Sequence, residues 1–343
     1  MEKIKTAFIE INKDNIDKEK IKIAGKAIKD GKLVAFPTET VYGLGADALN
    51  ENAVKKIFQV KERPFFDPLI VHISCLEELQ DIVSDFPDIA KKISKMFWPG
   101  PLTMVMKKNK KISQYVTAGL DTVAVRIPKH PIALELIRES KRPIAAPSAN
   151  IFTHTSSTNA QHVFTDLKNR IDIIIDGGET SVGVESTVID VSINPVNILR
   201  LGGITVEDLK KVIPDITINQ DSILNESKSP GMLKKHYATK AKLFLVEGGK
   251  EKMIQEIIKK AFYYHGLGKK IGILSSFENM NRYPNIFIVE ALGFENNLEL
   301  YAHNLYRKMR LLDDLQCDII ISESFENKGL GSAIMDRLRR ASN

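Results

Sequence analysis

The chain has few of the residues that mark exported, zinc-binding or membrane-spanning proteins. Cys75 and Cys317 are its only cysteines, and they lie far apart in the sequence. Two distant cysteines exclude a disulfide framework and a zinc cluster, and they fit a reducing cytoplasm. The chain has no run of about 18 apolar residues, and residues 1–20 alternate charge where a signal peptide would carry an apolar core. We therefore expect a soluble, cytoplasmic protein that does not enter a membrane.

Common ligand-binding motifs are also missing. The absence of a Gly-x-x-x-x-Gly-Lys-Ser/Thr loop excludes a P-loop NTPase. The seven histidines include no His-x-x-x-His pair, so we expect no metal site from the protein and any Mg²⁺ to be carried by substrate phosphates. Residues 43–48 match the loose dinucleotide pattern Gly-x-Gly-x-x-Ala, but they come too long after the preceding strand for the tight turn of such a site. A nicotinamide or flavin site is therefore not expected.

The charge of the chain is mildly positive and evenly spread. Its 49 basic and 43 acidic residues give a formal net charge of +6. No long block of like charges is present, which argues against a nucleic-acid-binding arm. A small positive excess can guide an anionic substrate, such as a nucleotide, toward a cleft, although most of these lysines are expected only to solvate helices.

Length and hydrophobic pattern predict two domains of mixed helices and strands. With 343 residues the chain is too long for one ordinary core. In the first domain, residues 1–213, apolar runs alternate with amphipathic helices, which predicts a large sheet. The expected strands are 32–36, 69–73, 102–106, 123–127, 143–146, 172–176, 186–191 and 197–201, and the expected helices are 17–30, 53–59, 132–139 and 206–212.

The remainder of the chain divides into a polar connection and a smaller domain. Residues 214–241 show no sustained period and are either a plain linker or a functional lid. In residues 242–343, four short apolar runs alternate with helical segments, of which 298–315 is the most regular. This alternation predicts a small parallel-sheet domain.

Three polar clusters in the first domain adjoin strand-like runs. Ser148 and Asn150 follow the apolar run 143–146, Lys61 and Arg63 precede the run 69–73, and Ser186 opens the run 186–191. Taken singly, the Ser-x-Asn pair fits a turn or a helix cap, and the two cations fit a helix C-terminus. Taken together, the clusters predict one pocket assembled at strand ends.

Charged side chains inside apolar strands strengthen this prediction. Arg126 and Arg200 each lie within an otherwise apolar run, where a guanidinium is seldom placed without a partner. One of them could be a structural ion-pair partner, but beside the hydroxyl clusters both resemble clamps for carboxylate or phosphate. His72 also lies in a buried-type strand, where a histidine is more often a core group than a catalyst.

Several segments, in this order, resemble the YrdC-like threonylcarbamoyl-AMP synthases. They are AFPTETVYGLGADA (35–48), KERPFFDPLIVHI (61–73), FWPGPLT (97–103), TAGLDTVAVRIPKHP (117–131), PIAAPSAN (143–150) and GVESTVIDV (183–191). SPGMLKKHYA (229–238) and GLGSAIMDRL (329–338) make the chain similar to the longer, two-domain type. The resemblance implies a twisted open α/β sheet with a concave cavity, a linker over 214–241 that passes above it, and a smaller Rossmann-like domain over 242–343.

The resemblance also implies an activity and partners. L-Threonine and bicarbonate or CO₂ would form a carbamate, which attacks the α-phosphate of ATP to give threonylcarbamoyl-AMP and pyrophosphate. The product would serve the modification of adenosine 37 of transfer RNA through a separate transferase of the KEOPS type, and weak contact with transfer RNA is possible. Mg²⁺ would accompany ATP.

Carried over position by position, the resemblance implies two adjoining sites, with Lys61 and Arg63 as electrostatic contributors and no assigned catalytic residue. The L-threonine site would comprise Thr40, His72, Arg126, Ser186 and the backbone near Ala146. The ATP site would comprise Lys61, Arg63, Asp67, Thr122, Ser148, Asn150, Ser156, Arg200 and the linker residue Tyr237.

Two departures from the family pattern concern the nucleotide. Asp67 stands where the family usually has asparagine, which places a carboxylate near polyphosphate, where it either weakens ATP binding or engages Mg²⁺. His154 and Ser157 replace the usual arginine and proline. A double-stranded RNA or transfer-RNA binding module without catalysis is the alternative function, and a decayed regulatory subunit is a third.

Overall fold

The structure, a computed structural model, describes residues 4–218 and 237–342. Its contacts divide the chain into two compact units. The first comprises residues 1–152, 156–181 and 185–233, and the second comprises 153–155, 182–184 and 234–343. The segments 153–155 and 182–184 lie within the first unit in sequence but pack in the second unit. The domain boundaries expected from the sequence, at 213 and 242, do not show this exchange. Most of the expected linker, 219–236, lies outside the described residues.

The first unit is built on a large mixed sheet. Its strands are β1 (Ala7–Glu10), β2 (Val34–Phe36), β3 (Gly43–Asp47), β4 (Ile70–His72), β5 (Leu102–Lys107), β6 (Thr122–Arg126), β7 (Ile144–Ala145), β8 (Ile173–Asp176), β9 (Thr187–Asp190), β10 (Asn197–Arg200) and β11 (Thr217–Ile218). They are hydrogen bonded in the order β1-β8-β2-β3-β7-β4-β6-β5-β9-β10-β11. Strands β7, β4, β6, β5 and β9 are thus central, and their ends face the site described below.

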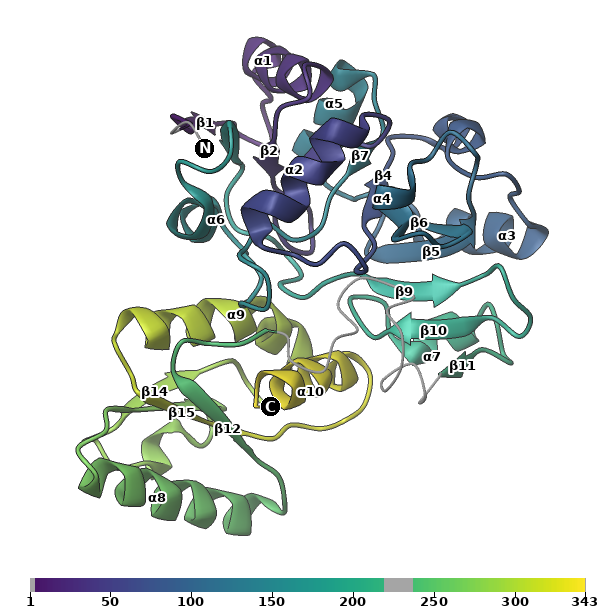
Figure 1. Cartoon of the computed structure of the whole chain (residues 1–343). Coiled ribbons are helices and arrows are strands. Elements are labelled where there is room, and N and C mark those ends of the chain that lie inside the picture. Colours follow the sequence, from purple (N-terminus) through teal and green to yellow (C-terminus); the bar gives the residue numbers. More distant parts are fainter. Residues whose placement is uncertain (1–3, 219–236, 343) are drawn as a thin grey trace. The chain divides into compact units, whose positions relative to one another are not determined.

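Helices cover this sheet (Figure 1). They are α1 (Lys18–Lys29), α2 (Glu51–Lys61), η1 (Leu76–Asp81), α3 (Asp88–Phe97), α4 (Gln114–Thr117), α5 (Pro131–Ser140), α6 (Ala160–Leu167) and α7 (Val206–Lys210). Helix α1 begins at its cap Asp17, whose carboxylate accepts from the amides of Glu19 and Lys20. Its apolar stripe, which includes Ile21 and Ile28, is buried in a cluster shared with α5.

Strand β3 lies in a segment that the sequence did not identify as a strand. Its residues, Gly43–Asp47, are all buried, and the strand pairs with β2 and β7. A Cβ atom at Gly45 would come within 2.7 Å of Ile144 Cγ2 and 2.8 Å of the Phe36 ring. The glycines that resemble a dinucleotide motif therefore allow close strand packing.

The second unit is a smaller α/β layer structure. Its strands are β12 (Lys242–Val246), β13 (Ile271–Ser275), β14 (Ile288–Ala291) and β15 (Ile319–Glu323), and its helices are α8 (Lys250–Gly266), η3 (Met280–Arg282), α9 (Leu298–Asp314) and α10 (Leu330–Ala341). All strand pairs are parallel, in the order β12-β15-β13-β14. Helix α8 covers one face, and α9 and α10 cover the other (Figure 1). The predicted parallel-sheet domain is confirmed.

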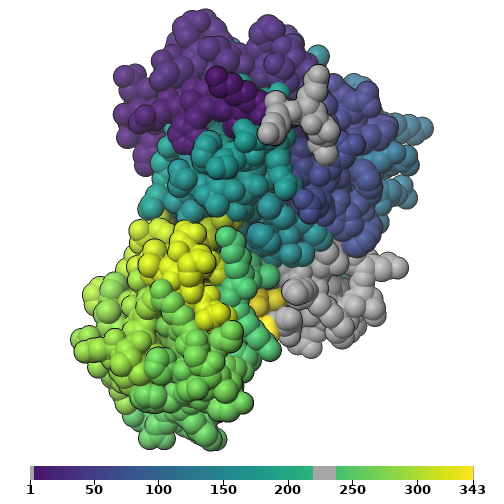
Figure 2. Space-filling view, turned by 60° about the vertical axis from the view of Figure 1, so that its left-hand side comes forward, coloured from purple at the N-terminus to yellow at the C-terminus, as the bar shows by residue number. Residues whose placement is uncertain are grey.

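Packing within the second unit joins residues from both of its ends. The yellow C-terminal residues share a surface with green residues from its start (Figure 2). Tyr237 stacks on Tyr306 with ring centroids 5.6 Å apart, and the guanidinium of Arg337 lies 5.2 Å from the Tyr237 ring. Asp313 accepts from the backbone amides of Lys240 and Ala241, both at 2.9 Å. None of the described helices is long and apolar enough to cross a bilayer.

Candidate functional site

The central strands of the first sheet bring predicted site residues to one end of the sheet. Strands β4 and β6 are parallel and end with His72 opposite Arg126. Strand β5 runs antiparallel to β6, so Thr103 lies near this end, and β9 begins beside it after Ser186. Strand β10 is antiparallel to β9 and ends here with Arg200. This end of the sheet therefore collects residues from segments almost 130 positions apart.

Arg126 is a buried cation at this end of the sheet. Its side chain is 4% exposed, and its Nη1 donates to Thr40 Oγ1 at 2.9 Å. Nη2 lies 2.8 Å from Glu39 Oε1, and Nε donates to the Gly100 carbonyl at 3.2 Å. The buried carboxylate of Glu39 compensates the charge of Arg126 and fixes its planar fork.

His72 is held in its neutral form at the same end. Burial, reinforced by the positive charge of Arg126, lowers the pKa of His72 to about 3. Its Nδ1 lies 3.2 Å from the Ile70 carbonyl oxygen. The neutral imidazole therefore adds no charge that would compete with Arg126 for an anion.

Ser186 and Arg200 are directly bonded. Arg200 Nη2 donates to the carbonyl oxygen of Ser186 at 2.9 Å and to its Oγ at 3.1 Å. The Ser186 hydroxyl also shares a hydrogen bond of 2.8 Å with Thr103 Oγ1. The serine predicted for threonine and the arginine predicted for ATP thus form one buried network.

Lys61 binds the loop that carries Ser148 and Asn150. Its fully buried ammonium donates to the Ser148 carbonyl oxygen at 2.6 Å and to the Asn150 carbonyl oxygen. The residue lies at the end of α2, whose cap Glu62 has the left-handed backbone conformation at φ 57°. The chain turns there and directs Lys61 inward, so the two predicted clusters meet.

Arg63 forms a buried ion pair with Asp67. Arg63 Nη2 lies 2.9 Å from Asp67 Oδ2, and the two side chains are 3% and 0% exposed. Arg63 also donates to the backbone carbonyls of Asp67 and Pro68. The carboxylate that departs from the family pattern therefore neutralises one of the two cations predicted to bind polyphosphate.

Four predicted residues remain, and each lies in a different place. Thr122 begins β6, four residues before Arg126 and therefore on the same face of the sheet. The Ala146 amide donates to the Ile70 carbonyl oxygen at 2.9 Å, beside β4. Ser156 Oγ donates to Glu185 Oε1 at 2.5 Å. Tyr237 belongs to the second unit, where it is 1% exposed.

Sequence reasoning missed Glu39 and Glu185, the acidic partners of this site. Both are buried, at 5% and 6% exposed. Their signal is a single glutamate next to hydroxyl residues: Glu39 lies between Thr38 and Thr40, and Glu185 precedes Ser186 and Thr187. Acidic residues are rarely buried unless paired, but only the fold shows which cation or hydroxyl is the partner.

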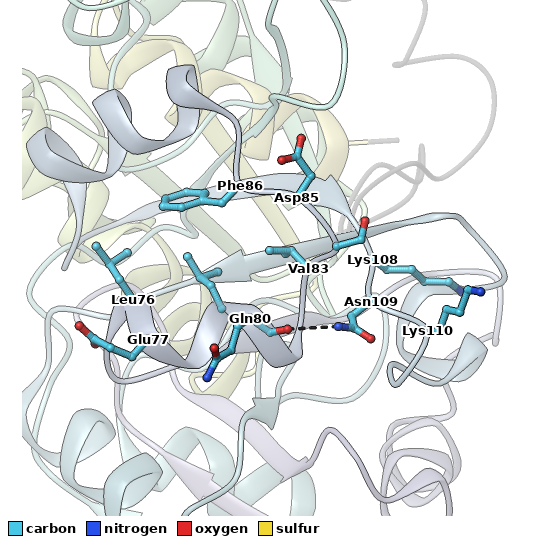
Figure 3. A pocket seen from close by; sticks show the side chains of 11 residues that line it. Leu76, Glu77, Gln80, Val83, Asp85, Phe86, Lys108, Asn109 and Lys110 are labelled. Carbon is cyan, nitrogen blue, oxygen red and sulfur yellow. Dashed lines mark hydrogen bonds between the residues drawn. The ribbon is translucent and has the colours of Figure 1, made fainter.

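A cavity of about 790 Å³ lies elsewhere in the first unit (Figure 3). It is lined by Leu76, Glu77, Leu79, Gln80, Val83, Ser84, Asp85, Phe86, Lys108, Asn109 and Lys110. On one side of the cavity, Asn109 Nδ2 donates a hydrogen bond to the Gln80 carbonyl oxygen at 3.1 Å. No residue predicted for threonine or ATP lines this cavity. Within the described ranges, no three His, Cys, Asp or Glu side chains gather closely enough to hold a metal ion.

Two protein-family models match the chain over most of its length. The model of the Sua5, YciO and YrdC proteins, described as "Telomere recombination", matches residues 26–202. The chain belongs to this family. A second model, "Threonylcarbamoyl-AMP synthase, C-terminal domain", matches residues 204–343, so both predicted domains have a counterpart.

Full-length relatives agree with both matches. The chain is 46% identical to the threonylcarbamoyl-AMP synthase of Pyrococcus abyssi, over 96% of each chain. It is 45% identical to the protein of that name from Bacillus subtilis, over 99% of this chain and 98% of the relative. The crystal structure of P. abyssi Sua5 complexed with L-threonine superposes with a TM-score of 0.93, at 46% identity and 98% coverage of each chain. The predicted family and fold class are thus confirmed.

Proposed function

We infer that this chain synthesises threonylcarbamoyl-AMP and pyrophosphate from L-threonine, bicarbonate or CO₂, and ATP. Full-length identity to two synthases and similarity to a threonine-bound structure support this function. The observation that carries it within this chain is the arrangement along β6. Arg126 ends the strand and Thr122 begins it on the same face, about 13 Å apart, and we assign the Arg126 end to threonine and the Thr122 end to the nucleotide.

At the threonine end, Arg126 binds the substrate carboxylate. Its guanidinium presents two parallel N–H donors, which match a carboxylate, and its burial strengthens the contact. The Thr40 hydroxyl and the Glu39 carboxylate hold this guanidinium before substrate arrives. The neutral ring of His72 and the Ser186 hydroxyl complete the walls of the proposed threonine site.

At the nucleotide end, buried cations oppose the triphosphate. The carbamate oxygen attacks the α-phosphorus, the bond from that phosphorus to the bridging oxygen breaks, and pyrophosphate leaves with the electron pair. Lys61 and Arg63 stabilise the negative charge on the departing group. Arg200 lies at the same end of the sheet as Arg126 and is hydrogen bonded to Ser186, so we assign it to the α-phosphate, next to the threonine site. Exclusion of water protects the carbamate and the adenylate.

Mg²⁺ would be held by the ATP phosphates. The described residues offer no carboxylate cluster for it, and the Asp67 carboxylate is paired with Arg63. When bound, the ion would neutralise phosphate charge. We further propose that the product passes to a separate transfer-RNA transferase of the KEOPS type, because a mixed anhydride must react before water destroys it. A cytoplasmic location and weak contact with transfer RNA stay predictions.

One assay tests the proposed function. We expect pyrophosphate release from ATP that requires both L-threonine and bicarbonate. Release that ignores threonine, or none at all, would contradict it. The alternative RNA-binding module predicts binding of transfer RNA that weakens steeply with salt and no pyrophosphate release.

A further inference from the structure

The second unit has a polar edge that the synthase residues do not use. Strands β13 and β15 are adjacent and parallel at the centre of its sheet. The chain leaving β13 continues to its neighbour β14, whereas the chain leaving β15 enters α10, which contacts β12 on the other side. The chain segments that leave the carboxyl ends of β13 and β15 therefore run in opposite directions along the sheet. In doubly wound sheets, ligands bind at such points.

A buried carboxylate occupies this edge. Glu323, the last residue of β15, is 1% exposed. Its Oε1 accepts from the Tyr283 hydroxyl at 2.5 Å, and its Oε2 accepts from the Ser276 amide at 3.1 Å and from Asn279 Nδ2 at 3.2 Å. Burial raises the pKa of Glu323. Its hydrogen-bond donors converge from the loop after β13, so a buried carboxyl group is held at the point where the connections part.

Two more carboxylates give this edge an excess of negative charge. Glu295 Oε1 accepts from Lys250 Nζ at 2.7 Å and from Asn279 Nδ2 at 3.4 Å. The Glu278 carboxylate accepts from the Glu295 amide at 3.2 Å. In the described ranges, Lys250 is the only ammonium bonded to these groups, and the nearby Arg282 is already paired with Glu251, so the carboxylates outnumber the cations that neutralise them.

Two buried polar atoms beside Glu323 lack a partner. Tyr301 is fully buried, and its hydroxyl makes no hydrogen bond to any residue that the structure describes. Burial and the charges of Glu323 and Glu278 raise the pKa of Tyr301, and the Ser276 side chain partly offsets them, so the hydroxyl lies near these groups. Asn279 Oδ1, 1% exposed as a residue, is likewise without a partner among the described groups. Both atoms can accept an N–H bond from a ligand.

An exposed aromatic pair flanks the same loops. Phe277 follows Ser276, and Phe294 precedes Glu295. The side chains are 39% and 52% exposed, and their ring centroids lie 4.8 Å apart. The Phe277 amide donates to the Gly293 carbonyl at 2.9 Å, which holds the two loops together. Aromatic faces next to carboxylates suit a ligand with both a cationic and an apolar part.

We propose that this edge of the second unit binds a small molecule that carries a protonated amine on an apolar or aromatic body. The amine donates to Tyr301 Oη and Asn279 Oδ1 in the field of the carboxylates, and the body lies against Phe277 and Phe294. An ammonium group fits better than a metal ion, because the carboxylates do not gather into a metal-binding group within the described residues. The site lies outside the residues proposed for synthesis, so its test is independent of that function.

Calorimetric titration of the full chain with 2-phenylethylamine at pH 7 tests the proposal, and 3-phenylpropionate serves as the anionic control. We expect the amine to bind and the anion not to bind. Tyr301→Phe removes only the hydroxyl and should weaken amine binding by about tenfold or more. Because that hydroxyl is buried without a partner, the same variant should keep or raise the midpoint of thermal unfolding.

Two further variants keep the result interpretable. Glu295→Gln retains the shape of a half-exposed side chain and should also weaken amine binding. Tyr263→Phe removes a hydroxyl from a side chain on α8 that is 64% exposed, and it should bind the amine as the natural chain does. The proposal is overturned if the amine does not bind, if amine and anion bind alike, or if Tyr301→Phe and Glu295→Gln bind with unchanged affinity.

Discussion

Glu39 and Arg126 form a buried ion pair across 87 positions of sequence, with Oε1 and Nη2 2.8 Å apart. The same guanidinium is proposed to bind the threonine carboxylate. Glu39 therefore holds the Arg126 guanidinium in place before substrate binds, and a substrate carboxylate has to share or replace this contact. Stability and threonine affinity are linked through the pair, and variants can separate them.

Arg126→Ala should weaken L-threonine binding by about 2 to 4 kcal/mol and ATP binding far less, because the substrate carboxylate loses its clamp. It should also destabilise the fold, since Glu39 becomes an unpaired buried charge. Adding Glu39→Gln should restore the midpoint of unfolding but not threonine affinity. Titration of each ligand, with Arg142→Ala as a surface control, checks this. Equal loss for both ligands would refute the assignment of Arg126.

Lys61→Met should lower turnover by about a hundredfold at saturating ATP, with little change in threonine affinity, because charge on the departing pyrophosphate loses its counter-charge. It also leaves the carbonyl oxygens of Ser148 and Asn150 without their buried donor. Arg63→Ala and Arg200→Ala should likewise depress turnover. Steady-state pyrophosphate release measures this, with Lys55→Met as control, because Lys55 is a partly buried lysine of the same helix that pairs with Glu51. Full turnover in these variants would show that Lys61, Arg63 and Arg200 have only a structural role.

Asp67→Asn should tighten ATP binding by about three- to tenfold. The carboxylate lies 2.9 Å from Arg63 Nη2 and reduces the positive charge available to polyphosphate. Asparagine keeps an acceptor for Arg63 but removes the negative charge. Nucleotide titration at fixed Mg²⁺ checks this, and Asp47→Asn is a matched control because Asp47 pairs with Arg142. Weaker ATP binding that depends on Mg²⁺ concentration would show instead that Asp67 engages the ion.

Stability should fall as the solution becomes acidic, through two buried histidines. Burial lowers the pKa of His72 to about 3, with help from Arg126, and lowers the pKa of His130 to about 4. The unfolded chain binds these protons near pH 6.5 and the folded chain does not, so their contribution is complete above about pH 6.5 and declines toward pH 4. At pH 5 each histidine should cost about 2 kcal/mol of unfolding free energy.

Urea unfolding at pH 7.5 and pH 5 measures this loss. His72→Gln removes one titrating group, so its stability should depend on pH about half as steeply. An unchanged slope in that variant would show that His72 does not titrate on unfolding.

The sequence predicted the cations of the site better than their partners. A guanidinium in the apolar run 123–127 is unusual enough to indicate function, and Arg126 is indeed buried at a strand end. Its partner Glu39 was not predicted, because a glutamate between two threonines resembles a turn and its distance from Arg126 is set by the sheet order. The Arg63–Asp67 pair was local, but its burial depends on the whole domain.

The sequence predicted strands where apolar residues form a continuous run. It missed the strand β3, whose glycines are placed by close packing against neighbouring side chains. The runs 123–127 and 197–201 lie within one residue of β6 and β10. Strand β3 was missed because glycine has low strand propensity. Glycine is needed at position 45 because the side chains of Phe36 and Ile144 leave no room for a Cβ atom. Contacts of this kind have no local signature.

The assignment of residues 153–155 and 182–184 to the second unit bears on how the chain folds during its synthesis. The Thr155 carbonyl accepts from Arg310 Nη2 at 2.6 Å, and a Cβ atom at Gly183 would come within 2.3 Å of the Ala302 carbonyl oxygen. At ribosomal speed, α9 emerges roughly 10 to 30 s after Thr155. Residues 153–155 and 182–184 therefore gain these partners only after most of the chain has been made, although they come before the second unit's other residues in the sequence.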